Sequence, residues 1–114
     1  MKRWNTLSNT VFALLLLACL PTTLLAKGDP AAGKGKAQVC EACHGPDGMS
    51  VAPIYPKLAG QHQDYLVKAL ADYRAGRRSN PIMGPMAANL SDQEIEDLAA
   101  WFSSLNGLKD LSKP

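Results

Sequence analysis

The sequence predicts an all-α domain of three to four helices. Three observations carry this prediction. Apolar residues recur at helical spacing in residues 62–75 and 91–105, and loops rich in Gly and Pro separate these segments. Cys40, Cys43 and His44 form a C-x-x-C-H motif, which attaches a haem covalently. A haem gives the helices of a short chain a large apolar body to pack around.

The C-x-x-C-H spacing matches haem chemistry. Residues i, i+3 and i+4 share one face of a helix, so Cys40 and Cys43 can form thioether bonds to the two vinyl groups while His44 binds iron. A redox dithiol and a zinc site are the alternatives. The first usually accompanies a βαβ pattern, which is not visible here. The second needs four ligands, and His62 is the fourth candidate. Because the motif occurs once, we expect one haem c and its iron.

The first 26 residues resemble a secretory signal peptide. A basic start is followed by an apolar run at 11–20, and Ala26 offers a cleavage site that leaves a domain of residues 27–114. Lipidation at Cys19 and an uncleaved anchor are alternatives, although the run is shorter than the roughly 20 residues that span a bilayer. We therefore expect a periplasmic protein with no stable membrane insertion after cleavage.

Charge excludes one class of partner. The chain has 12 basic and 10 acidic residues, and loss of Lys2 and Arg3 with the signal leaves ten of each. A nucleic-acid-binding protein needs a basic surface, so nucleic acid is not an expected partner.

Each helix has its own signals. The first is predicted from Pro30 into the Cys pair, capped by Asp29, and Gly33 and Gly35 mark the close approach of another helix. An irregular loop follows at 45–60. The second helix spans 62–75, and Gly76 ends it.

Residues 79–90 are predicted to form a second loop. The last helix begins at the capping box that Ser91 forms with Glu94, and Asn106 and Gly107 stop it. Trp101 is expected to pack over Gly33 or Ala37.

His44 is the predicted proximal iron ligand. A ligating imidazole usually donates its other N–H to a carbonyl or carboxylate, and the Pro-rich loop suggests the carbonyl of Pro53. Four residues could supply the sixth ligand: His62, Met49, Met83 and Met86. The loop position of the last two favours them, because a loop of this kind can cross the far face of the haem and a thioether favours Fe(II).

The chain resembles a class I c-type cytochrome. It is most similar to the small soluble bacterial monohaem kind and to one half of the periplasmic dihaem proteins. The resemblance is carried by residues 33–45, 51–61 and 82–105. It implies the small cytochrome c fold, a crossing of the first and last helices, and Met83 as the axial ligand with Met86 as packing.

The function expected on this basis is a periplasmic electron carrier, not an enzyme. Its partners would be larger redox proteins, such as respiratory complexes and terminal oxidases or reductases, that dock transiently. Two alternatives remain open: a haem enzyme or sensor with an open iron, and a fixed haem subunit of a dehydrogenase or oxidase complex.

Overall fold

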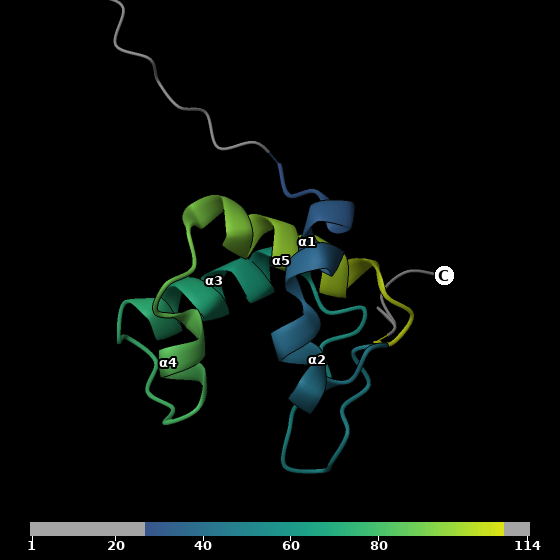
Figure 1. Cartoon of the computed structure of the whole chain (residues 1–114), viewed down its shortest axis with the longest axis horizontal. Helices are drawn as coiled ribbons and strands as arrows, with labels where there is room; N and C mark the ends of the chain where they lie inside the picture. Colours follow the sequence, from purple (N-terminus) through teal and green to yellow (C-terminus); the bar gives the residue numbers. More distant parts are fainter. Residues whose placement is uncertain (1–26, 109–114) are drawn as a thin grey trace, which may run out of the picture.

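Five helices make up the part of the chain that the computed structural model describes, residues 27–108 (Figure 1), and residues of three of them line an open cavity. They are α1 (Pro30–Lys36), α2 (Gln38–His44), α3 (Gln63–Arg74), α4 (Met83–Ala87) and α5 (Asp92–Ser104). No strand occurs within residues 27–108, and the predicted all-α fold is confirmed. The predicted signal segment, residues 1–26, lies outside the described residues.

The number of helices exceeds the predicted three to four for two local reasons. The helix predicted from Pro30 through Cys43 divides at Ala37, whose N–H bonds to the carbonyl of Lys34. The second reason is α4, in a segment predicted to be a loop. The Asn80 side-chain oxygen accepts from the backbone N–H groups of Ile82 and Met83 at 2.9 Å, and the turn that these bonds form leads into the short helix.

Helices α1 and α5 cross closely at one of the two glycines that the sequence indicated, Gly33. A Cβ atom added at Gly33 would lie 1.9 Å from the carbonyl oxygen of Asp97 and 2.8 Å from the Cβ of Trp101. The predicted packing of Trp101 over Gly33 is therefore confirmed. Gly35 has nothing within 4 Å of the same position, so the expectation of a close neighbour there is wrong.

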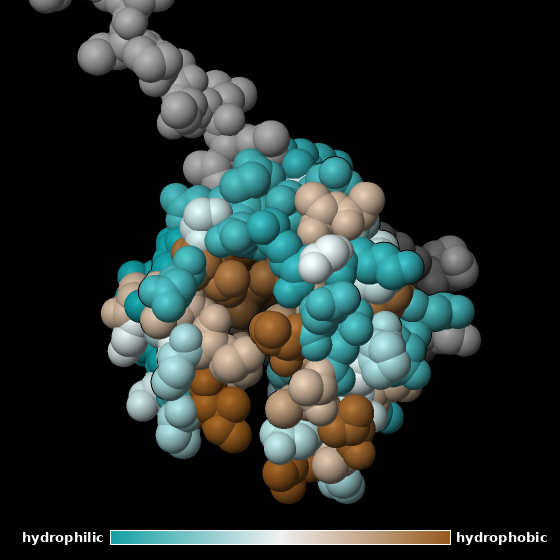
Figure 2. All heavy atoms as spheres, viewed as in Figure 1, coloured by the Kyte–Doolittle hydropathy of each residue, from teal (hydrophilic) through white to brown (hydrophobic). Residues whose placement is uncertain are grey.

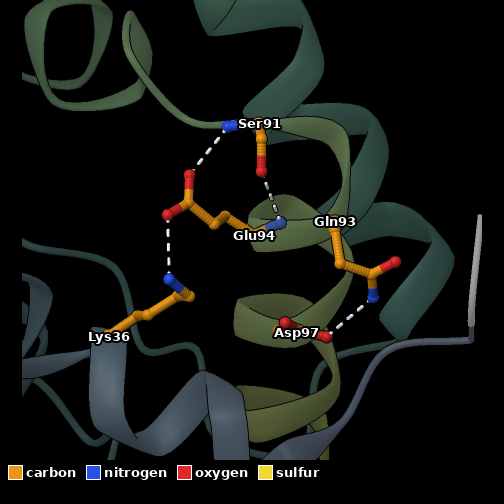
Figure 3. Close-up of polar contacts among 5 residues, drawn as sticks. All are labelled: Lys36, Ser91, Gln93, Glu94 and Asp97. Atoms are coloured by element: carbon orange, nitrogen blue, oxygen red, sulfur yellow. Dashed lines mark hydrogen bonds and ion pairs between the residues drawn. The ribbon is translucent and has the colours of Figure 1, made fainter.

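Polar contacts fix the two helices beside this crossing (Figure 3). The capping box is present, because the Ser91 hydroxyl accepts from the N–H of Glu94 and the Glu94 carboxylate accepts from the N–H of Ser91. The same carboxylate pairs with Lys36 of α1 at 2.8 Å. The buried carboxylate of Asp97 accepts from the Asp29 N–H and from the side chain of Gln93, both at 2.9 Å.

The core joins α3 and α5 to the start of the haem motif. Its buried members are Ala37, Leu66, Leu98, Ala99 and Phe102, and Cys40 and Leu58 pack against them. The α5 residues follow the predicted i, i+3, i+4 spacing. This core holds α2 in place, and α4 contacts α3. Figure 1 shows α2 and α4 apart from each other, and residues of both helices line the cavity.

Candidate functional site

Helix α2 presents the three residues of the motif to the cavity. Cys40 and Cys43 are half-buried free thiols, and His44, the last residue of α2, is buried. Gly45 follows with a φ of 83°, a left-handed value that suits glycine, and turns the chain out of the helix. All three side chains line the same cavity, as the spacing predicted.

The His44 ring is held by a backbone carbonyl, but not by the predicted one. Its Nδ1–H donates to the carbonyl oxygen of Pro56 at 2.8 Å. Pro53 lies on an open surface hollow shared with Met49 and Val51, so the prediction that Pro53 provides this carbonyl is wrong. Because Nδ1 donates to Pro56, Nε2 of the neutral ring is left as the metal-binding atom.

The main cavity has a volume of about 380 Å³ and opens to solvent between two lobes. Figure 2 shows the opening as a slot, with apolar side chains inside it and on both sides of its mouth. Its lining comprises Val39, Cys40, Cys43, His44, Ile54, Tyr55, Pro56, Tyr73, Asn80, Ile82, Met83 and Met86. None of these is a carboxylate, an ammonium or a guanidinium group, so this chamber suits a flat apolar ligand.

A second chamber of about 150 Å³ adjoins the first. Both chambers are lined by His44, Pro56, Tyr73 and Met83. The second chamber also touches the apolar face of α3 at Leu66, Ala69 and Leu70. The four shared residues place the two chambers next to each other.

The four candidate sixth ligands separate by position. Met83 lines both chambers together with His44, whereas Met86 lines only the larger chamber and is 42% exposed at its mouth. Met49 lies on the separate surface hollow, and His62 lines neither chamber. Of the four candidates, Met83 is the one that lines the same two chambers as His44.

The pKa values of two side chains at the site, one in the motif and one next to it, are raised. Burial raises the pKa of the Cys40 thiol, and the nearby Glu41 carboxylate adds to this effect. A hydrogen bond with Cys43 raises the pKa of the Tyr55 hydroxyl. Both groups are thus favoured in their neutral forms.

The donor set fits a haem. Two free thiols at the i and i+3 positions, an oriented imidazole, and two thioethers surround an apolar cavity. Zinc does not fit as well, because no group of three or more His, Cys, Asp or Glu side chains in the described part of the chain could hold a metal ion. Iron with one imidazole and one thioether needs no such cluster.

Several lining residues were not identified from the sequence. Tyr73 of α3 lines both chambers, and Asn80 and Ile82 come from the segment that precedes Met83. The signal for Pro56 was its place in Pro-Lys-Leu-Ala-Gly, the segment that carries part of the family resemblance.

Comparison with known proteins gives a consistent result. The Cytochrome c family model matches residues 30–106. Cytochrome c4 from Thiocapsa roseopersicina is 58% identical over 78 residues, which cover 68% of this chain and 40% of that protein. Cytochrome c-554(548) from Halomonas halodenitrificans is 50% identical over 80 residues, covering 68% of this chain and 96% of that protein.

A solved structure agrees with the fold. The crystal structure of reduced recombinant cytochrome c4 from Pseudomonas stutzeri has a TM-score of 0.67 and 50% sequence identity. The match covers 71% of this chain and 47% of the solved chain. The chain thus spans about half the length of the cytochrome c4 relatives that it matches.

Proposed function

Because the chain belongs to the cytochrome c family, we propose that it carries single electrons between larger redox proteins in the periplasm, using one haem with His/Met axial ligation. The chain is a c-type cytochrome, and its cofactor is covalently bound haem c with iron. When bound, that group supplies a one-electron Fe(III)/Fe(II) couple.

Cys40 and Cys43 are the residues proposed to hold the haem covalently. Both are free thiols on one face of α2, and both line the cavity that also contains His44. Cys40 packs against the core of α3 and α5, so covalent attachment at α2 would hold the haem next to this core. The role of these residues is therefore retention and orientation.

His44 and Met83 are proposed as the axial ligands. The Pro56 carbonyl accepts the Nδ1 proton of His44, which leaves Nε2 for iron and raises its basicity. Met83 is the methionine that shares both chambers with His44. A thioether ligand stabilises Fe(II) and raises the reduction potential. Two strong ligands would also close the iron, which suits electron transfer better than catalysis or gas binding.

The mouth of the cavity supports contact with a partner. Val39, Ile54, Ile82 and Met86 line the cavity and are 62%, 80%, 52% and 42% exposed, respectively. Because they line the cavity and are exposed, these residues form its apolar rim, and Figure 2 shows apolar side chains on both sides of the slot. Exposed apolar groups gathered at one opening mark a binding surface, and desolvating them brings a partner close to the thioether side of the site.

Location and partners are proposed from the N-terminal sequence and from the relatives. The proposed signal segment, residues 1–26, would export the chain to the compartment where c-type haem is attached. Within the described residues, no helix is long and apolar enough to cross a membrane. Two relatives are named as electron acceptors of thiosulfate dehydrogenase, so a larger periplasmic redox enzyme is a reasonable kind of partner.

The observation that carries the ligand assignment is the position of Met83 beside His44 in both chambers. Its test compares Met83→Ala with Met86→Ala in the haem-loaded protein. Met83→Ala should abolish the far-red sulfur-to-iron absorption band, lower the reduction potential and allow rapid carbon monoxide binding. Met86→Ala should retain the band. The reverse pattern would show that Met86 is the ligand, and an open iron in the unmodified protein would favour an enzyme or sensor.

A further inference from the structure

Among residues 27–108, the only cations that line either chamber belong to the second one. Lys57 and Arg78 line this chamber, together with the polar side chains of Gln61 and Tyr65. No carboxylate lines either chamber. The cavity is therefore apolar around Cys40 and Cys43 and cationic at its other end.

Arg78 is held in place without an acidic partner. Its guanidinium group lies 4.8 Å from the centre of the Tyr73 ring, and it donates to the Tyr65 hydroxyl at 3.4 Å. The nearby carboxylate of Asp72 pairs instead with Lys68 and Arg77. Among residues 27–108, neither Arg78 nor Lys57 forms an ion pair. A charge that lines a cavity in this way is available to an anionic ligand group.

The haem has the matching pattern of polarity. Its vinyl groups react with thiols at one edge of the ring, and it also carries two carboxylates away from that edge. Attachment through Cys40 and Cys43 therefore directs the carboxylates towards another part of the cavity. The second chamber, which shares His44 and Met83 with the first, is the part that offers cations.

We infer that Arg78 and Lys57 bind the haem carboxylates, with the Tyr65 and Tyr73 side chains orienting the guanidinium group. This inference rests on the proposed haem function and assigns a second recognition site within it. A cation beside these carboxylates stabilises the extra electron of the Fe(II) state, so Arg78 and Lys57 are positioning residues that raise the reduction potential.

The test is the reduction potential of the haem-loaded protein and of four variants. Arg78→Gln and Lys57→Gln should each lower the potential, and Arg78→Lys should restore most of the loss because it keeps the charge. Arg77→Gln is the matched control, since Arg77 is exposed as Arg78 is, but pairs with Asp72 and lines neither chamber. We expect a change of about tenfold in the Fe(III)/Fe(II) equilibrium for Arg78→Gln, which is about 59 mV for one electron, and little change for the control.

A vibrational measurement separates direct contact from a distant charge effect. In resonance Raman spectra, the bending mode of the haem carboxylates should shift in Arg78→Gln and stay in place in Arg77→Gln. Equal effects of the two substitutions on potential and spectrum would overturn the inference while leaving His/Met ligation intact. Failure of the unmodified protein to acquire any haem would overturn the proposed function and this inference together.

Discussion

Substitution of Gly33 tests how closely the two terminal helices must approach. An alanine Cβ at this position would lie 1.9 Å from the Asp97 carbonyl oxygen and 2.6 Å from its carbonyl carbon. Both are backbone atoms of α5, so no side-chain rotation can relieve the overlap, and α1 and α5 must separate. The separation would also disturb the Asp29–Asp97 hydrogen bond, which lies at the same crossing.

The magnitude follows from two opposing effects. Alanine is favoured over glycine in a helix interior by about 1 kcal/mol. Overpacking costs about 1–3 kcal/mol, and the rigid backbone neighbours at Gly33 place it at the upper end of that range. Gly33→Ala should therefore destabilise the fold by about 2 kcal/mol, which lowers the melting temperature by roughly 8–16 °C in a domain of this size.

Gly35→Ala is the matched control, because it changes the same residue type two positions along α1. Nothing lies within 4 Å of a Cβ at Gly35, so only the helix preference acts. We expect stabilisation by about 1 kcal/mol, or roughly 4–8 °C. The assay is thermal unfolding of the haem-loaded variants, followed by circular dichroism at helical wavelengths. If both substitutions raised the melting temperature equally, the close crossing would be refuted.

Two further predictions concern acid stability and docking. The Lys36 ammonium and the Ser91 N–H lower the pKa of Glu94 to about 2. The ionised Glu94 carboxylate therefore contributes its full stabilisation above its usual pKa of 4.5, and this stabilisation is lost as the pH falls towards 2. Glu94→Gln should flatten the decline of melting temperature over that range, and an unchanged slope would contradict the role of the ion pair. Because the cavity mouth is uncharged, electron self-exchange measured by NMR should vary less than about threefold as ionic strength rises from about 0.01 M to 0.15 M. Ile54→Lys should slow exchange and make it strongly salt-dependent; equal salt dependence in both proteins would argue against docking at the rim.

The sequence predicted those features that depend on local spacing. The capping box at Ser91 and the common face of Cys40, Cys43 and His44 both follow from helical periodicity, and the structure contains them. The close approach at Gly33 was also predictable, since glycine inside a helix is costly without a packing reason.

Features that depend on tertiary geometry were less accessible. The carbonyl that holds His44 belongs to Pro56 and not Pro53, because the path of the 45–60 loop decides which proline reaches the ring. Helix α4 was not predicted, because it follows a turn that the Asn80 side chain forms inside a Pro- and Gly-rich segment. The cationic chamber was not predicted, because neighbouring arginines have different surroundings in the fold. Arg77 pairs with Asp72, whereas Arg78 lines the second chamber.

Mass spectrometry of the peptide that contains Cys40–His44 tests covalent attachment at its source. The protein should be produced with its full N-terminus in cells that mature c-type haems, denatured in acid and digested. The peptide should carry the mass of one haem, and that mass should be absent when both Cys40 and Cys43 are replaced by Ala. A peptide recovered from the unmodified protein with two free thiols, or with a disulfide between them, would contradict the haem site described above.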